Sequence, residues 1–143
     1  MAKLFGTDGI RGEANRYPMD AAVAFGVGQA VAHLFKRPDH RPSVIIGKDT
    51  RISGPMLESA VEAGVSSMGG ISHRVRVLHT PGVAFISRSM RADAGVMISA
   101  SHNPYQDNGI KIFSGNGFKL SDEQEEVIET LILGGRLPKM APE

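Results

Sequence analysis

Apolar residues recur with a helical period in several segments of the chain. After Asp20, a suitable helix cap, the spacing predicts a helix whose inner face is formed by Val23, Val27, Ala30, Val31 and Leu34. A second helix is expected to begin at Ser53 or Gly54, because Pro55 suits a first turn, and to bury Leu57, Ala60, Val61, Val65 and Met68. A third helix is expected from Pro81 to about Met90.

A fourth helix carries clear start and stop signals. Ser121 and Gln124 have the spacing of a capping box, and Gly134-Gly135 would end the helix. Its inner face is predicted to consist of Val127, Ile128 and Leu131. In the first helix, Gly26 and Gly28 cost about 1 kcal/mol each relative to alanine, which close packing against a strand would offset.

Short apolar runs between the helices predict strands. They lie at 43–47, around Val75 and Val77, at 96–98 and at 109–113. A turn signal at 114–117 (SGNG) predicts that residues 118–120 return as a hairpin. Strands that alternate with helices imply an α/β sandwich with a mostly parallel sheet, which a closing antiparallel hairpin would make mixed.

Composition narrows the class of protein. The chain has 143 residues, of which 41% are hydrophobic and 22% charged, as in one globular domain. A net charge of +1 gives no reason to expect a nucleic-acid partner, and no apolar run has membrane-spanning length. The absence of cysteine excludes disulfides and thiolate metal sites. Without a signal-peptide core at the N-terminus, we expect a cytoplasmic protein.

Three polar loops follow strand-like segments: 5–12 (FGTDGIRG), 47–54 (GKDTRISG) and the serine loop, 99–104 (SASHNP). In a parallel sheet the second and third loops would lie at the same edge, where α/β proteins collect ligands. Each loop alone also has a structural explanation. Thr7-Asp8 suits a tight turn, Asp49 or Ser53 suits a helix cap, and Asn103-Pro104 suits a turn.

Four cations and one hydroxyl give the three loops a common chemistry. Arg11, Lys48, Arg51 and Lys111 lie in or beside the loops, and such cations next to glycine-rich turns suit phosphate oxygens. Backbone amides of glycine turns and helix N-termini favour the same ligand. A serine at a strand end can act as a nucleophile or carry a phosphoryl group. The combination predicts phosphoryl transfer, in which positioning and charge neutralisation do most of the catalysis.

The same loops resemble a known family. Residues 5–12, 47–51 (GKDTR), 80–84 (TPGVA), 98–104 (ISASHNP) and 107–111 (DNGIK) resemble, in order and spacing, the first domain of the α-D-phosphohexomutases. The opening motif points to the phosphoglucosamine mutase branch. The resemblance covers nearly the whole chain and implies a three-layer α/β/α domain I over residues 1–133, with a mixed, mostly parallel sheet. It further implies the start of an interdomain linker at 134–143, with domains II–IV absent.

The resemblance also implies a reaction. Ser101 would carry a phosphoryl group and donate it to a phosphosugar, then take the other group back after the bisphosphorylated sugar reorients. Such enzymes interconvert glucosamine 6-phosphate and glucosamine 1-phosphate, on the route to UDP-N-acetylglucosamine and peptidoglycan. The matching catalytic residues are Ser101, His102, Arg11 and Lys111, and the candidate phosphate- or substrate-binding residues are Thr7, Lys48, Arg51 and Asn103.

The implied cofactor is one Mg²⁺, bound by an oxygen of phosphorylated Ser101 and by three aspartates of a second-domain loop. That loop (DGDGDR) does not occur in this sequence, where Asp8, Asp49, Asp93 and Asp107 are scattered. We therefore expect an isolated first domain without mutase activity of its own. Its partners would be a phosphosugar and the remaining domains of the same polypeptide, and the surface left open would favour self-association.

A second departure lies at 72–79 (SHRVRVLH), where relatives have a more apolar strand. His73 and His79 are expected to be solvated loop residues rather than ligands.

Several alternatives stay open on the sequence. A sister mutase acting on phosphomannose or phosphoglucose would share these motifs. A serine hydrolase would use Ser101 as acyl acceptor, although no Gly-x-Ser-x-Gly elbow surrounds it. As an isolated unit, the chain could also serve as a non-catalytic binding module. Ser99 rivals Ser101 as the reactive residue, but its position at the strand end favours burial.

Overall fold

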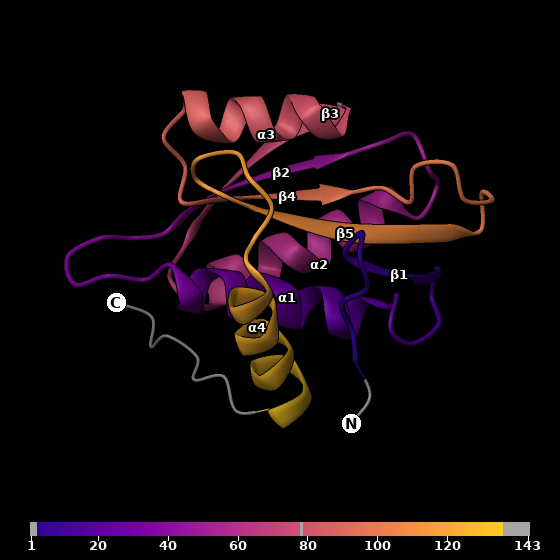
Figure 1. The fold of residues 1–143 in the computed structure, drawn as a ribbon, viewed down its shortest axis with the longest axis horizontal. Coiled ribbons are helices and arrows are strands. Elements are labelled where there is room, and N and C mark those ends of the chain that lie inside the picture. Colours follow the sequence, from indigo (N-terminus) through magenta and orange to yellow (C-terminus); the bar gives the residue numbers. More distant parts are fainter. Residues whose placement is uncertain (1–2, 78, 136–143) are drawn as a thin grey trace.

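The computed structural model describes residues 3–77 and 79–135, which form a five-stranded sheet with helices on both faces (Figure 1). The elements are β1 (Ile10–Glu13), α1 (Ala21–Leu34), β2 (Ser43–Lys48), α2 (Gly54–Ser67), β3 (Ile71–Val77), α3 (Thr80–Ser89), β4 (Ala94–Ile98), β5 (Asp107–Ser114) and α4 (Asp122–Gly134). Helices α1, α2 and α4 lie on one side of the sheet and α3 on the other. The predicted three-layer α/β/α fold is therefore confirmed.

The sheet is mixed, with the strand order β1-β5-β4-β2-β3. Strand β2 pairs in parallel with both β3 and β4, whereas β5 runs antiparallel to both of its neighbours, β1 and β4. Four strands thus share one direction and β5 opposes them. The expected return at 118–120 is present in reduced form: the segment makes an antiparallel bridge between Phe113 and Lys119, with backbone hydrogen bonds from Ser114 to Phe118 and from Leu120 to Ile112, but it forms no strand of its own.

Strand β1 corrects the expectation that residues 5–12 form one polar loop. Ile10 pairs with Ile110, and Arg11 with Gly109, at the edge of the sheet. Of the four residues in β1 only Ile10 is buried, so the strand lacks the apolar alternation that sequence patterns detect. The segment 5–12, which the sequence predicts to be a loop, therefore places Arg11 on a strand.

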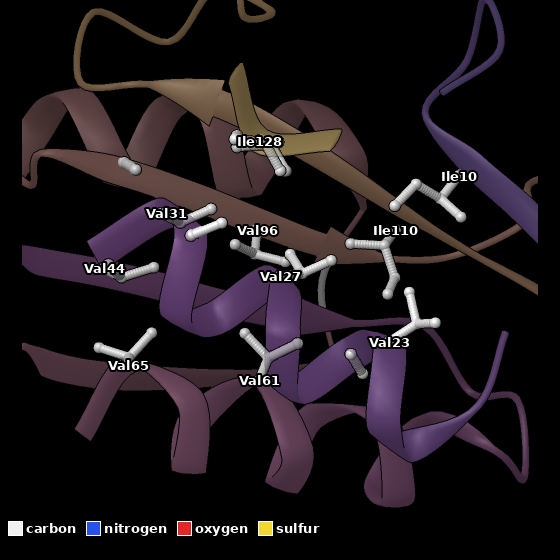
Figure 2. Close-up of a cluster of buried hydrophobic side chains, with 14 of the residues drawn as sticks. Ile10, Val23, Val27, Val31, Val44, Val61, Val65, Val96, Ile110 and Ile128 are labelled. Carbon is white, nitrogen blue, oxygen red and sulfur yellow. The ribbon is translucent and has the colours of Figure 1, made fainter. Parts of the chain in front are cut away.

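The main core lies between the sheet and the layer of α1, α2 and α4. Figure 2 shows valines of α1 and α2 packed against Val44, Val96 and Ile110 of the sheet, with Ile128 of α4 joining them. The predicted inner faces of the first two helices are confirmed. Their buried members are Val23, Val27, Ala30, Val31, Leu57, Val61, Val65 and Met68, and Leu34 and Ala60 pack against them half-buried.

The two long helices cross at their glycines. A Cβ atom on Gly28 would lie 2.1 Å from the carbonyl oxygen of Val61, and one on Gly64 would lie 2.1 Å from that of Phe25. The close approach that was expected to offset the cost of Gly28 is therefore made to α2, and the predicted strand partner is wrong. The absence of side chains here lets the two backbones touch.

The opposite face of the sheet carries a smaller core. Ile45, Val83, Ala92 and Met97 are buried there beneath α3, and Val75 packs against them. Strand β3 lies at the edge of the sheet, which accounts for the polar composition of 72–79. His73 lies within β3, contrary to its predicted loop position, whereas His79 is exposed ahead of α3.

The start of α1 and both ends of α4 follow the sequence signals, whereas Ser53 makes no capping hydrogen bond at the start of α2. Asp20 Oδ1 accepts a hydrogen bond from the backbone N–H of Val23 at 2.9 Å, and Ser121 and Gln124 form the capping box. Gly135 ends α4 in the left-handed conformation (φ 61°). The inner face of α4 is partly corrected, because Ile128 is buried but Val127 is 45% exposed. Glu125 is buried in its place.

The predicted domain boundary at 133 stays a prediction, and the linker residues 136–143 lie outside the described part of the chain. Within the residues that are described, none of the helices combines the length and apolar character needed to cross a membrane.

We expect Gly28→Ala to destabilise the fold by about 2 kcal/mol or more, because the new methyl group would overlap the backbone of α2. Gly26→Ala, on the same helix, is the matched control. Its Cβ would lie 3.5 Å from the side chain of Ile132, an ordinary contact, so the better helix propensity of alanine should stabilise by up to about 1 kcal/mol. Urea denaturation measures both. Equal effects from the two variants would contradict the close crossing.

Glu125 should make stability depend on pH. Burial raises the pKa of its carboxyl group above the ordinary 4.5, and the Lys119 ammonium 3.5 Å away only partly opposes this. Because its pKa is raised, the folded protein favours the protonated, neutral form of Glu125. The free energy of unfolding therefore has its full contribution from this group below about pH 4.5 and loses it as the pH rises through the folded-state pKa.

Glu125→Gln, which cannot ionise, should therefore raise the midpoint of thermal unfolding at pH 7 and leave it nearly unchanged at about pH 3.5, where the carboxyl group is protonated in both states. Glu126→Gln, an exposed neighbour on the same helix, is the control. A Glu125→Gln effect of the same size at both pH values would show that packing rather than charge is responsible.

Candidate active site at the serine loop

The serine loop joins β4 to β5 at the carboxyl end of β4. Lys48, the last residue of β2, pairs with Ile98, the last residue of β4, so the loop after β2 lies beside the serine loop. On the other side, β1 brings Arg11 next to β5. The three polar loops identified in the sequence therefore converge at one edge of the sheet.

Ser101 presents its hydroxyl to two cations. Its side chain is exposed, and its Oγ lies 3.1 Å from Lys111 Nζ and 3.5 Å from Arg11 Nη2. Arg11 and Lys111 lie on the same face of the sheet, because Arg11 pairs with Gly109 and residues 109 and 111 share one side of β5. Adjacent strands thus place two positive charges against one hydroxyl.

Ser99, the rival candidate, has a structural role. The residue is 5% exposed, and its Oγ donates to Asp49 Oδ2 at 2.7 Å and accepts the N–H of Ser101 at 3.1 Å. Its hydroxyl is therefore occupied as both donor and acceptor, whereas that of Ser101 points to the open side. The geometry favours Ser101 as the reactive serine.

Arg11 keeps unused donor capacity. Its Nη1 donates to the carbonyl oxygen of Ala100 at 2.9 Å and to Asn103 Oδ1 at 3.1 Å. Its Nε is buried and has no hydrogen-bond partner in the described part of the chain. The group suited to an incoming anion is Nη2, whose printed contact is the 3.5 Å approach to the exposed Ser101 hydroxyl.

Arg51 differs from Arg11 in this respect, and its predicted role as a phosphate or substrate ligand stays a prediction that its contacts do not favour. Its Nη1 donates to the carbonyl oxygens of Pro104 and Asp107 (2.7 and 3.0 Å), and its Nη2 to those of Ser101 and Asn103 (2.9 and 3.0 Å). Its Nε donates to Asp49 Oδ2 at 3.1 Å. All five N–H donors of the guanidinium group therefore have protein acceptors. Through these hydrogen bonds Arg51 holds the backbone of the serine loop.

Lys48, also predicted to bind phosphate or substrate, is engaged elsewhere. Its Nζ lies 3.0 and 3.1 Å from the two carboxylate oxygens of Glu58, whose side chain is 2% exposed. Arg74 Nη1 reaches the same carboxylate at 3.2 Å. Through Lys48 and Arg74 this buried carboxylate ties β2 and β3 to α2, and the predicted binding role of Lys48 stays a prediction.

The remaining predicted residues, Asn103, His102 and Thr7, differ in their contacts. Asn103 accepts from Arg11 and donates from Nδ2 to Asp107 Oδ2 at 3.3 Å, so it braces the loop. His102 is exposed, and its ring makes no hydrogen bond to any described residue. Thr7 is exposed in the turn between Gly6 and Gly9 and lines a shallow cavity of about 400 Å³ that Arg11 also lines.

Sequence reasoning missed the part played by Asp49. The sequence suggests only a helix cap, but Asp49 Oδ1 accepts the backbone N–H of Arg51 at 3.0 Å while its Oδ2 accepts Ser99 and Arg51 Nε. The spacing Asp-x-Arg carried a usable signal, because an aspartate commonly bonds to the backbone two residues ahead. The contact to Ser99, fifty residues away in sequence, had no local signal.

The arrangement has consequences for the chemistry it can perform. A hydroxyl between a lysine and an arginine favours a charged phosphoryl group, because both cations stabilise negative charge on its oxygens. A histidine bonded to the serine hydroxyl, as in a Ser-His-Asp triad, is not found at Ser101 among the described residues. The geometry therefore disfavours a serine hydrolase of the Ser-His-Asp type.

Comparison with known proteins identifies relatives along nearly the whole chain. The family described as phosphoglucomutase/phosphomannomutase, alpha/beta/alpha domain I, matches residues 2–138. The chain is 71% identical over 142 residues to the phosphoglucosamine mutase of Syntrophobacter fumaroxidans and 58% identical to that of Syntrophus aciditrophicus. These matches cover 99% of the chain and 32% of each relative, so the chain spans about a third of their length.

Solved structures agree with the sequence relatives. A phosphoglucomutase/phosphomannomutase family protein from Burkholderia thailandensis superposes with a TM-score of 0.82 at 27% identity, over 95% of this chain and 31% of that one. A putative phosphomannomutase from Thermus thermophilus gives a TM-score of 0.78 at 27% identity, over 90% and 29%. With the predicted fold and the converging loops in place, the chain belongs to the phosphoglucomutase/phosphomannomutase family, as its α/β/α domain I.

Proposed function

We propose that this chain is the phosphoserine-bearing domain of a phosphoglucosamine mutase and that Ser101 carries the phosphoryl group. The observation that carries the proposal is the exposed Ser101 Oγ, 3.1 Å from Lys111 Nζ and 3.5 Å from Arg11 Nη2. The name of the relative that is 71% identical supports the choice of sugar. The full polypeptide would interconvert glucosamine 6-phosphate and glucosamine 1-phosphate through a bisphosphorylated sugar.

The chemistry follows from the two cations. In the first half-reaction a sugar hydroxyl oxygen attacks the phosphorus, its proton passes to a base, and the bond between phosphorus and Ser101 Oγ breaks. Negative charge then develops on Oγ, where Lys111 and Arg11 stabilise it. In the second half-reaction Ser101 Oγ attacks the other phosphoryl group of the reoriented sugar, the bond between that phosphorus and its sugar oxygen breaks, and the sugar oxygen takes back the proton from the base. The same two cations serve both directions because they contact the serine oxygen itself.

Mg²⁺ belongs to this proposal, but the described residues do not form a Mg²⁺ site of their own. They contain no group of three or more histidine, aspartate or glutamate side chains that could hold a metal ion. Asp49, the carboxylate nearest in sequence to the loop cations, is already bonded to Ser99 and Arg51. In our proposal this chain supplies one ligand, an oxygen of phosphorylated Ser101, and the rest of the polypeptide supplies the others.

The rest of the polypeptide also supplies the groups that recognise the sugar. This assignment is consistent with curated relatives about three times as long as the chain. We therefore expect the 143-residue chain to lack mutase activity. Self-association of this domain stays a prediction, to which the exposed apolar side chains Val127 and Leu133 of α4 lend support. We keep the cytoplasm as its location, because a cysteine-free sequence suits a reducing compartment.

The sister activities are the second candidate. The solved neighbour from Thermus thermophilus is called a putative phosphomannomutase, and it shares this fold at 27% identity. The much higher identity to phosphoglucosamine mutases makes glucosamine phosphate the first substrate to test. Comparing turnover of glucosamine 6-phosphate, mannose 6-phosphate and glucose 6-phosphate by the full-length enzyme separates the two.

In the full-length enzyme, Ser101→Ala should abolish turnover of glucosamine 6-phosphate and remove the phosphate found by intact mass and phosphopeptide mapping. Ser89→Ala, an exposed serine at the end of α3, should leave both unchanged. Phosphate on Ser99, or full activity of Ser101→Ala, would refute the assignment. Formation of glucosamine 1-phosphate by the 143-residue chain alone would refute the expected need for the other domains.

Lys111→Met should lower kcat of the full-length enzyme by about 10²- to 10³-fold, because it removes one of two cations from the oxygen on which charge develops. Lys119→Met, which removes a lysine that contacts Glu125 on α4, is the control and should retain activity. A change confined to KM would show that Lys111 binds the sugar phosphate in the ground state instead.

A further inference from the structure

The backbone of Ser101 adopts a conformation that other groups must hold. Its φ is 54°, in the left-handed region, and it is not a glycine. This region costs a residue with a side chain about 1–2 kcal/mol. Such a conformation persists where the surrounding structure enforces it, and it occurs preferentially at functional sites.

The side chains of Ser99 and Arg51 contact the backbone of Ser101, and Asp49 links the two. The N–H of Ser101 donates to Ser99 Oγ at 3.1 Å, and its carbonyl oxygen accepts from Arg51 Nη2 at 2.9 Å. The side chains of Ser99 and Arg51 are in turn joined by one acceptor, because Ser99 Oγ and Arg51 Nε both donate to Asp49 Oδ2, at 2.7 and 3.1 Å. The hydrogen bonds therefore close a ring that runs from Asp49 through Ser99, Ser101 and Arg51 back to Asp49.

The ring extends along the loop but does not reach the reacting oxygen. Arg51 also holds the carbonyl oxygens of Asn103, Pro104 and Asp107. The contacts of Ser101 Oγ come instead from Lys111 and Arg11, among the residues that the structure describes. Ser99 and Arg51 thus contact only the backbone of Ser101 and Lys111 contacts only its oxygen, whereas Arg11 contacts that oxygen and also the carbonyl oxygen of Ala100.

We propose that Asp49, Arg51 and Ser99, together the serine clamp, are positioning residues that hold Ser101 in its left-handed conformation and so keep Oγ between Lys111 and Arg11 in both half-reactions. The proposal rests on the function proposed for Ser101. The clamp fixes the serine before the sugar arrives, and the loss of such positioning, by about 1 Å, costs about 10²-fold in rate. Its effect should therefore fall on kcat.

Arg51→Lys is the sharpest variant, because lysine keeps the positive charge but cannot serve four carbonyl oxygens and Asp49 together. In the full-length enzyme we expect kcat to fall by about tenfold to hundredfold, with KM for glucosamine 6-phosphate within about twofold of wild type. Arg16→Lys, an exposed arginine that pairs with Glu13, is the matched control and should change neither constant.

Hydrogen exchange tests the clamp independently of turnover. In Arg51→Lys and in Ser99→Ala, the amides of Ser101 and Asn103 should exchange at least about tenfold faster, while those of β2 and β4 keep their protection. Unchanged exchange in the loop would overturn the proposal. So would a raised KM with kcat retained, because it would make Arg51 a substrate ligand.

A milder variant covers the case in which Arg51→Lys fails to fold. Ser99→Ala removes only one arm of the ring, so its melting temperature should stay near that of the wild type. A lower kcat in a folded Ser99→Ala enzyme supports the clamp, and an unchanged kcat overturns it. A phosphate-free Ser101 in active wild-type enzyme would instead refute the proposed function, and with it the purpose of the clamp.

Discussion

The antiparallel course of β5 is the constraint on which the site depends. A parallel strand after β4 would need a long crossover, whereas an antiparallel one follows after a short loop. The short loop carries Ser101, and the return strand carries Lys111 back to it. Because β5 also pairs with β1, the same strand brings Arg11 to the serine from the other end of the domain's sequence. One reversal of chain direction therefore assembles all three groups.

Stability and chemistry are divided between the two faces of the sheet. The face toward α1, α2 and α4 is filled by the main core, where Ile10 and Ile110 pair beneath the site (Figure 2). Along β1 and β5 the alternate residues, Arg11, Gly109 and Lys111, point to the opposite side. Alternation along a strand thus lets a buried residue hold the sheet together while its neighbour takes part in the site.

The sequence predicted the layers of the fold because helical periods, caps and apolar strand runs are local signals. Asp20, Ser121 and Gly135 mark helix ends through contacts within a few residues. Strand β1 was missed because only one of its four residues is buried, and its pairing with β5 joins residues about one hundred positions apart. Local patterns contain no information about such a partner.

The sequence predicted which loops form the site but not which of its cations are already bonded to other parts of the protein. Glycine-rich turns and nearby cations correctly indicated which loops converge, yet the same reasoning expected Arg51 and Lys48, like Arg11 and Lys111, to face phosphate oxygens. Residue type cannot separate them, because the distinction lies in acceptors supplied from elsewhere: loop carbonyl oxygens for Arg51 and buried Glu58 for Lys48. Whether a cation is free for a ligand depends on tertiary contacts.

The polar edge strand β3 has a consequence for assembly. An unpaired edge invites another strand to extend the sheet, and proteins block this with charges and irregular backbone. In β3, Arg76 has a positive φ (63°), the pairing with β2 shifts register at that end, and Arg74 is fixed by Glu62 and Glu58. Continuation of the sheet across two molecules is therefore blocked on this side. Contacts between copies that avoid this edge, for example through helical surfaces, leave the pairing of β3 unaltered.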